Sequence, residues 1–385
     1  MNCEKTEFGL PRMPVEENSE PSFSSLESLR KAIEGIREIP GTEGFYNAAA
    51  WKVDEKTYLL GRNGVTGGEG KPDVGSLVLK ILGSDGNIVS SKEVWQPRVG
   101  EDLLEDARAL LLLDGRIAFG LTSVAHEGED YIPYPAVLIT STEELMEKML
   151  PKPKVIKAMG RIAITSLEEL MEGMLPEPEV IEVMGKGGQT TPLDEDISIS
   201  AGKNVTALSP DLFAFRSEGD NNNHRLKVFG YQQEDGKVTF KQSLDFSENK
   251  PPWGEYRIGT TMPPVWLNKD EAFLPIHGIN LVDSKYVYSI GTARLLRDEN
   301  GILSVDNISQ EPIIDPDLFV GMFNSDEIEL HSERRVVYCC GGIPFYNDSG
   351  EFEHLKLYVN VGDKRTVEVT VSVDKLIKGW QRNGV

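Results

Sequence analysis

Short apolar segments follow one another at regular spacing from residue 45 onward, and this pattern limits the folds open to the chain. About fourteen of these segments have the length and composition of β-strands, and Gly, Asp, Asn or Pro bounds each of them. Turn pairs such as Asp85-Gly86, Asp114-Gly115 and Asn300-Gly301 stand where hairpins need them. So many strands, spread over roughly 330 residues with little helix between them, exceed one ordinary sandwich. They predict an all-β fold, a β-propeller of about five blades with four strands per blade.

The first 44 residues have a different pattern and are expected to form an N-terminal extension. Ser24 and Glu27 have the spacing of a capping box, and apolar residues at helical spacing follow them. The pattern predicts an amphipathic helix over 25–39, so the propeller would occupy residues 45–385.

A 25-residue segment occurs twice in tandem within residues 139–185. Ile139-Thr140-Ser141 recurs as Ile164-Thr165-Ser166, and the Glu-Leu-Met, Met-Leu-Pro, Val-Ile and Met-Gly sequences that follow recur with it. Two copies of a strand-plus-short-helix unit are too few for a solenoid, which needs at least three. We expect one copy to belong to the sheet and the other to protrude as an insertion.

Composition excludes several classes of partner. The formal net charge of −22 would repel the phosphates of a nucleic acid, although it leaves room for a local cationic pocket. No apolar run approaches the roughly 18 residues of a membrane span, and the first residues lack the apolar core of a signal peptide. A cytoplasmic location is therefore expected. The three cysteines give no disulfide framework, and the scattered histidines predict no metal site.

Polar residues recur beside small residues at the ends of the predicted strands. The inner strands of a propeller meet around a central channel, so residues at their ends can share one funnel. An isolated lysine or histidine in such a place is more often solvated or structural, but several clusters along the whole chain favour a common site. The clusters are Asn47, Arg62, Glu105-Asp106 with Arg108, Lys203-Asn204, His277 and Asp363.

In order and spacing these clusters resemble glycoside hydrolase family 130, the β-mannoside phosphorylases and related hydrolases. The resemblance covers roughly residues 45–375 and implies a five-bladed β-propeller, in agreement with the strand count. The matching stretches include Asn47-Ala48-Ala49, Glu105-Asp106-Ala107-Arg108, Lys203-Asn204-Val205, Ile276-His277-Gly278 and Tyr358–Asp363.

The resemblance also implies roles. The aspartate of the family's Glu-Asp-Pro-Arg motif is the general acid and corresponds to Asp106; in the phosphorylases it acts through a sugar hydroxyl while inorganic phosphate attacks the anomeric carbon with inversion. Lys203 and His277 fall on phosphate-binding positions, and Arg108 would assist them. The residues that would line the sugar site are Asn47, Arg62, Glu105, Asn204 and Asp363. The expected partner is a small oligosaccharide or glycoside, with phosphate as co-substrate and no cofactor.

Two departures keep alternatives open. Ala107 stands where the family has proline, and Asp363 follows Asn-Val-Gly where the family has Gly-Ala-Ala. A hydrolase on the same fold would need a second carboxylate to activate water. Candidates for it are Glu218, Asp220 and Glu255. A non-catalytic carbohydrate-binding propeller is the third alternative, and the oligomeric state, a homo-oligomer included, stays open. A single suggestive carboxylate motif favours phosphorolysis, because phosphate is itself an anionic nucleophile.

Overall fold

A computed structural model describes most of the chain beyond residue 29, and strands dominate it. The helical segments of the described part are α2 (Thr142–Glu147), α4 (Ser325–Ile328) and the 3-10 turns η1 (Pro252–Gly254) and η2 (Pro316–Phe319). Among the residues described, no helix has the length and apolar character needed to cross a membrane. The described residues are 30–65, 74–97, 103–127, 130–148, 150, 154–155, 162–163, 180–181, 201–218, 224–231, 238–248, 250–330, 334–373 and 375–376.

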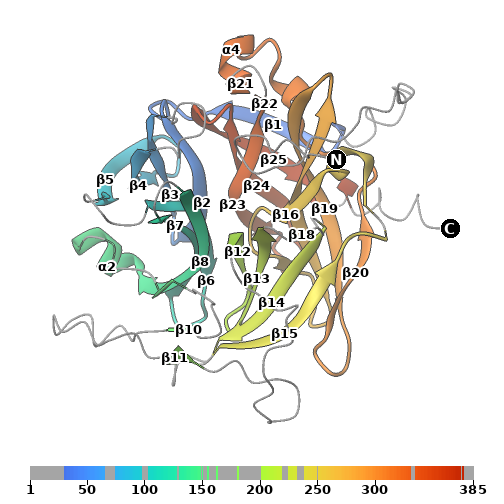
Figure 1. Cartoon of the computed structure of the whole chain (residues 1–385). Helices are drawn as coiled ribbons and strands as arrows, with labels where there is room; N and C mark the ends of the chain where they lie inside the picture. The colour runs from blue at the N-terminus through green and yellow to red at the C-terminus, as the bar shows by residue number, and fades with distance from the viewer. Residues whose placement is uncertain are drawn as a thin grey trace.

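Five sheets, antiparallel except for one strand pair of the fourth, are arranged around a central axis as the blades of a propeller, which confirms the predicted fold (Figure 1). Blade 1 contains β2 (Phe45–Val53), β3 (Lys56–Val65), β4 (Val74–Leu82) and β5 (Ile88–Trp95). Blade 2 contains β6 (Leu103–Leu111), β7 (Arg116–Glu127), β8 (Asp130–Ser141) and β9 (Lys154–Val155). Blade 3 contains β12 (Ala201–Ser209), β13 (Leu212–Glu218), β14 (Arg225–Tyr231) and β15 (Val238–Asp245).

The last two blades are less regular. Blade 4 is built from β16 (Arg257–Thr260), β18 (Glu271–Val282), β19 (Lys285–Arg297) and β20 (Leu303–Ile308), and it also carries β17 (Val265–Trp266), β21 (Glu329–Leu330) and β22 (Arg334–Arg335). Blade 5 contains β23 (Val337–Tyr346), β24 (Phe352–Val361) and β25 (Arg365–Ser372), and β1 (Ile33–Glu38) is its outermost strand.

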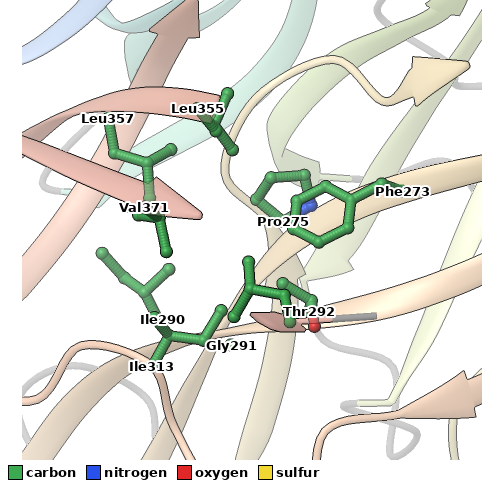
Figure 2. A pocket seen from close by; sticks show the side chains of 10 residues that line it. Phe273, Pro275, Ile290, Gly291, Thr292, Ile313, Leu355, Leu357 and Val371 are labelled. Atoms are coloured by element: carbon green, nitrogen blue, oxygen red, sulfur yellow. The ribbon is translucent and has the colours of Figure 1, made fainter. Parts of the chain in front are cut away.

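The apolar core is divided into layers between neighbouring blades. Successive side chains of a strand point to opposite faces of its sheet. Accordingly Ala49 and Trp51 of β2 pack toward blade 2, whereas Ala48 and Ala50 pack toward blade 5. Figure 2 shows the layer between blades 4 and 5, whose apolar side chains leave no volume for a water molecule.

The prediction of a helix over 25–39 is wrong for residues 33–38, which form β1 and pair antiparallel with β25. The register shifts between Ile33 and Gly35, and such a bulge inserts one extra residue. Ile33 and Ile36 can therefore both pack against the core layer of blade 5 although they are three residues apart. That spacing mimicked a helix. The ring consequently includes residues that the prediction had assigned to the N-terminal extension.

The first copy of the tandem duplication is part of blade 2. It supplies the end of β8, then α2, whose N-terminus has a capping box between Ser141 and Glu144, and then β9. Leu145 of α2 is fully buried in the layer between blades 1 and 2. In the second copy, β11 (Val180–Ile181) pairs with β10 (Ile162–Ala163) in a two-stranded sheet separate from the blades. The rest of the second copy lies outside the described residues.

Candidate active site

Three inner strands place a polar side chain at a strained backbone position near the axis. Asn47 of β2, Asp106 of β6 and Asn204 of β12 have φ values of 52°, 53° and 61°. Each residue lies where the register of its strand shifts, which is the signature of a β-bulge. Asn and Asp tolerate this left-handed conformation better than other residues, and a bulge re-aims a side chain. The repeated bulges thus bring one polar group from each of blades 1, 2 and 3 to a common place.

The carboxylate of Asp106 is held by blade 1. The Nδ2 atom of Asn47 donates a hydrogen bond of 2.8 Å to its Oδ1, and Nη1 of Arg62 lies 3.9 Å from the same oxygen. Arg62 also pairs with Glu105 at 3.1 Å and lies over the ring of Tyr46. The side chain of Asp106 keeps 13% of its surface exposed, so it can reach a ligand while its neighbours fix its orientation.

Blade 5 adds a second carboxylate to the same hydrogen-bonded chain. The Nδ2 atom of Asn360 donates to Oδ1 of Asn47 at 3.0 Å and also to Oδ1 of Asp363. Asp363 lies in the turn after β24 with a φ of 52°, which is again left-handed. Two amides therefore connect the carboxylates of Asp106 and Asp363 across the junction of blades 1, 2 and 5.

Arg108 lies beneath Asp106 with no exposed surface. Its Nη1 donates to the backbone carbonyl of Asp106 at 2.8 Å, and its Nη2 donates to Oδ1 of Asn204 at 3.1 Å and to the hydroxyl of Tyr338 at 2.5 Å. A buried guanidinium is costly unless its donors are satisfied, and these bonds satisfy two of its three nitrogens. Through these hydrogen bonds Arg108 connects blades 2, 3 and 5.

His277 of β18 is fully buried next to Asn204. Its Nδ1 lies 3.2 Å from the carbonyl oxygen of Thr260, and its Nε2 lies 3.4 Å from Nδ2 of Asn204. A carbonyl only accepts, so Nδ1 carries the proton and Nε2 is the acceptor. Burial, followed by the positive charges of Arg216 and Arg108, holds the pKa of His277 well below its usual value. The imidazole is therefore neutral at neutral pH.

Lys203 brings a further cation to the edge of this cluster. It precedes Asn204 on β12 and stands directly opposite Arg216 of β13. Like charges directly opposite one another destabilise a sheet, and an anion bound between them would relieve that repulsion. Lys203 is partly exposed, whereas Arg216 is buried. With Arg62 and Arg108 these residues make four cations against the three carboxylates of Glu105, Asp106 and Asp363. A chain of net charge −22 thus has a local cationic bias.

The structure brings the predicted residues together, with different degrees of access. Hydrogen bonds and ion pairs, one of them through Asn360, join the following residues in one cluster: Asn47, Arg62, Glu105, Asp106, Arg108, Asn204, His277 and Asp363. Arg108 and His277 have no exposed surface, so they stand one layer behind Asp106 and Asn204. Their assignment as phosphate ligands stays a prediction, as do the roles of the other residues.

The carboxylates suggested for a hydrolase are not part of the described cluster. The side chain of Glu255 is 62% exposed and lies 3.8 Å from Lys250. The side chain of Glu218 and all of Asp220 lie outside the described residues. Within the part of the chain that the structure describes, no group of three His, Cys, Asp or Glu side chains has the arrangement of a metal site.

Sequence reasoning missed Tyr338, Asn360 and Gly259. Tyr338 and Asn360 have the alternation of ordinary strand residues, and only contacts across blades reveal them. A Cβ atom on Gly259 would lie 2.4 Å from Cε1 of His277 and 2.8 Å from Nδ2 of Asn204. Glycine is thus needed there for blades 3 and 4 to meet. A glycine within a short strand is the only signal of this in the sequence.

Comparisons with known proteins find similarity at the level of structure. No protein-family model matches the sequence, and no curated protein matches it. A solved structure of the β-1,2-mannobiose phosphorylase from Listeria innocua, in complex with β-1,2-mannobiose, matches with a TM-score of 0.56 at 13% identity, covering 91% of this chain and 94% of that one. The shared fold is the five-bladed β-propeller.

Two other structures have the same similarity to this propeller. A putative glycoside hydrolase from Parabacteroides distasonis matches with a TM-score of 0.53 at 13% identity over 90% of this chain and 95% of its own. A structure described with the GH130 mannoside phosphorylases, a family containing glycoside hydrolases that target β-1,2-mannosidic linkages in Candida mannan, matches with a TM-score of 0.51 at 14% identity over 93% and 97%. Near-complete coverage on both sides means that the whole ring, and not one blade, is shared.

Proposed function

We propose that this protein is a carbohydrate-active enzyme that cleaves a β-mannoside or a similar small glycoside by inverting phosphorolysis. Asp106 delivers a proton toward the leaving-group oxygen as the C1–O bond breaks. An oxygen of inorganic phosphate attacks C1 from the opposite face, so a sugar 1-phosphate and a free acceptor result. No cofactor is needed. The cytoplasmic location belongs to the proposal and rests on the sequence alone.

The observation that carries this proposal is the setting of Asp106. Its carboxylate is partly exposed on a left-handed bulge and is oriented by a 2.8 Å hydrogen bond from Asn47. Strained backbone at a bulge is common beside active sites, because it aims a side chain that regular pairing would not. A general acid must be held within hydrogen-bond reach of the oxygen it protonates, which a fixed carboxylate near the channel allows.

The cations around Asp106 support phosphate as the nucleophile. Lys203 and Arg216 face each other across β12 and β13, and Arg62 lies 3.9 Å from Asp106. Phosphate carries about two negative charges near neutral pH, and Lys and Arg bind it through charge-assisted hydrogen bonds. Phosphate bound there would offset the repulsion between Lys203 and Arg216.

One observation favours hydrolysis as the second candidate. Asp363 is a second carboxylate, joined to Asp106 through Asn47 and Asn360. An inverting hydrolase uses such a carboxylate as the base that activates water. In that reaction phosphate would have no effect on the rate, so the two candidates are separable by one measurement.

The test is release of sugar 1-phosphate from a panel of β-mannosides and β-glucosides, with and without inorganic phosphate. We expect phosphate-dependent release by the parent protein and a loss of about 10²–10⁴-fold in Asp106→Asn, the usual contribution of a general acid. Asp114→Asn is the matched control, because Asp114 lies in an exposed turn and pairs only locally with Arg116.

The other outcomes contradict phosphorolysis in different ways. Release of free sugar that does not depend on phosphate, together with its loss in Asp363→Asn, would assign a hydrolase. Binding of a saccharide without turnover, unchanged in Asp106→Asn, would assign a carbohydrate-binding propeller.

A further inference from the structure

A closed triangle of hydrogen bonds joins three blades beside the bulge that carries Asp106. The hydroxyl of Tyr338 donates to Oδ1 of Asn204 at 2.8 Å and accepts from Nη2 of Arg108 at 2.5 Å. Nη2 of Arg108 also donates to Oδ1 of Asn204 at 3.1 Å, which closes the triangle. The three side chains come from blades 5, 2 and 3, and they are only 7%, 0% and 3% exposed.

We propose that Tyr338 is a positioning residue for the site: its hydroxyl fixes the guanidinium of Arg108 and the carboxamide of Asn204. Through Arg108 it also fixes the bulge that presents Asp106. This inference rests on the proposed role of Asp106 as the general acid. Tyr338 does not touch the reacting atoms in this arrangement, so it acts through its two partners.

The chain of contacts from Tyr338 to Asp106 is short. Arg108 uses Nη2 for Tyr338 and Asn204, and it uses Nη1 for the backbone carbonyl of Asp106 at 2.8 Å. That carbonyl belongs to the residue with a φ of 53°. A left-handed aspartate is strained and persists only when its surroundings over-determine it. A guanidinium locked at both ends supplies such a constraint.

Loss of the hydroxyl would loosen Arg108 in particular. The buried Nε of Arg108 has no hydrogen-bond partner, so the bonds of Nη1 and Nη2 hold the guanidinium. Without Tyr338 Oη, Nη2 would keep only Asn204. The Asn204 carboxamide would at the same time lose its donor from Tyr338 and keep its contact with His277. Both partners could then rotate toward other arrangements.

The ring and the hydroxyl of Tyr338 have separable functions. The ring packs edge-on against His277, with centroids 4.7 Å apart, and Arg108 lies 5.8 Å from its centroid. A phenylalanine would preserve this packing and remove only the hydroxyl. Burial also raises the pKa of Tyr338 well above its usual value, although Arg108 opposes the shift, so the hydroxyl remains a donor throughout the working range of pH.

The experiment compares Tyr338→Phe with Tyr358→Phe. Tyr358 is the matched control because it is also a buried tyrosine of blade 5, and its hydroxyl contacts Glu368 at 3.5 Å, away from the channel. We expect Tyr338→Phe to lower kcat by about 10–100-fold. A change of this size corresponds to the loss of one hydrogen bond to a charged group. Its KM for the glycoside should stay within about threefold, and Tyr358→Phe should change neither parameter.

A double-mutant cycle with Arg108→Lys separates positioning from general damage. If Tyr338 acts through Arg108, adding Tyr338→Phe to Arg108→Lys should cause little further loss of kcat. Full additivity of the two losses would overturn the proposed route from Tyr338 through Arg108 to Asp106, because the hydroxyl would then act independently of Arg108.

A crystal structure of Tyr338→Phe tests the proposal without any turnover. We expect the Arg108 guanidinium or the Asn204 carboxamide to move from its position in the parent, with a changed backbone at Asp106. Both side chains in their parental positions would overturn the inference, whether or not the parent is active. A parent without phosphorolysis would instead overturn only the proposed function, so the two failures are distinguishable.

Discussion

Blades 1 to 3 and blades 4 and 5 supply the channel in different ways. In the first three blades the inner strand itself carries the polar group, at the left-handed bulges of Asn47, Asp106 and Asn204. In blade 4 the equivalent strand has Gly259 and no register shift, and the polar group, His277, comes from the neighbouring strand. In blade 5 the register shifts at Cys340, while the polar groups are Tyr338 and Asn360 nearby.

The difference shows that the inner strands of the blades contribute to the polar cluster in two ways. Where the bulge residue is Asn or Asp, strain is used to aim a side chain toward the axis. In blade 4 the inner strand makes room at Gly259, and in blade 5 it carries Tyr338 without a left-handed residue. There His277, Tyr338 and Asn360 support the groups that the bulges aim. The comparison therefore predicts that equivalent substitutions will have unequal effects in the two sets of blades.

Asn204→Ala should have the largest effect of the substitutions that test this comparison. Alanine is costly in a left-handed backbone, and the change leaves Arg108 and Tyr338 with one buried partner fewer. We expect a loss of unfolding free energy of about 2–4 kcal/mol and a kcat lowered by about 100-fold. Urea unfolding and steady-state kinetics measure the two effects, and Asn204→Asp, which tolerates the same φ, would recover the stability of the backbone. A fully active Asn204→Ala would contradict the view that the bulge residues of blades 1 to 3 supply the polar groups of the site.

Gly259→Ala tests whether blade 4 makes room for the cluster. The added Cβ would meet both His277 and Asn204 at less than 3 Å, so overpacking should cost roughly 1–3 kcal/mol of unfolding free energy and displace Asn204. Gly35→Ala is the control, because a Cβ there has nothing within 4 Å. Equal thermal stability of the two variants would show that the close approach at Gly259 is not needed.

The pH dependence of stability tests the neutral state of His277. Its pKa is depressed in the folded protein, chiefly by burial, so the unfolded chain binds a proton more readily. The stabilisation is complete above the unfolded pKa of about 6.5 and decreases as the pH falls below it, by at most about 1.4 kcal/mol per pH unit. His277→Gln should therefore show a flatter decline of unfolding free energy between pH 7 and pH 5 than the parent. Parallel curves would mean that the imidazole is not held neutral.

Cys340→Ala should have the smallest effect and completes the comparison. The thiol is fully buried, and burial raises its pKa well above the usual value, so it is protonated and inert. We expect activity within about twofold of the parent and a stability cost near 1 kcal/mol for the small cavity. Alkylation by iodoacetamide at pH 8 should require unfolding. A large loss of kcat in this variant would assign Cys340 to the active site. Blade 5 would then resemble blades 1 to 3, because a residue at the register shift of its inner strand would contribute to the site.

The sequence predicted the strands, and it predicted that polar residues gather at the ends of the inner strands, because both depend on local patterns. Alternation and turn pairs mark each blade, and Asn47, Asp106 and Asn204 stand beside small residues that a bulge accommodates. What it could not predict depends on partners distant in the chain. The local pattern of residues 33–38 predicts a helix, whereas these residues form β1 because they pair with β25, which lies more than 300 residues away. Tyr338 likewise gains its role only where three blades meet.

Closure of the ring by β1 and β25 also affects how the protein is made. A ribosome releases β1 long before β25, so β1 must wait for its partner until more than 300 further residues have been synthesised. Tyr338, Asn360 and Asp363 emerge in the same late segment. Contacts between segments so far apart in sequence form slowly. A nascent chain would therefore carry Asp106 with its partners from blade 1 but without Tyr338, Asn360 and Asp363. The site would be completed only when blade 5 folds.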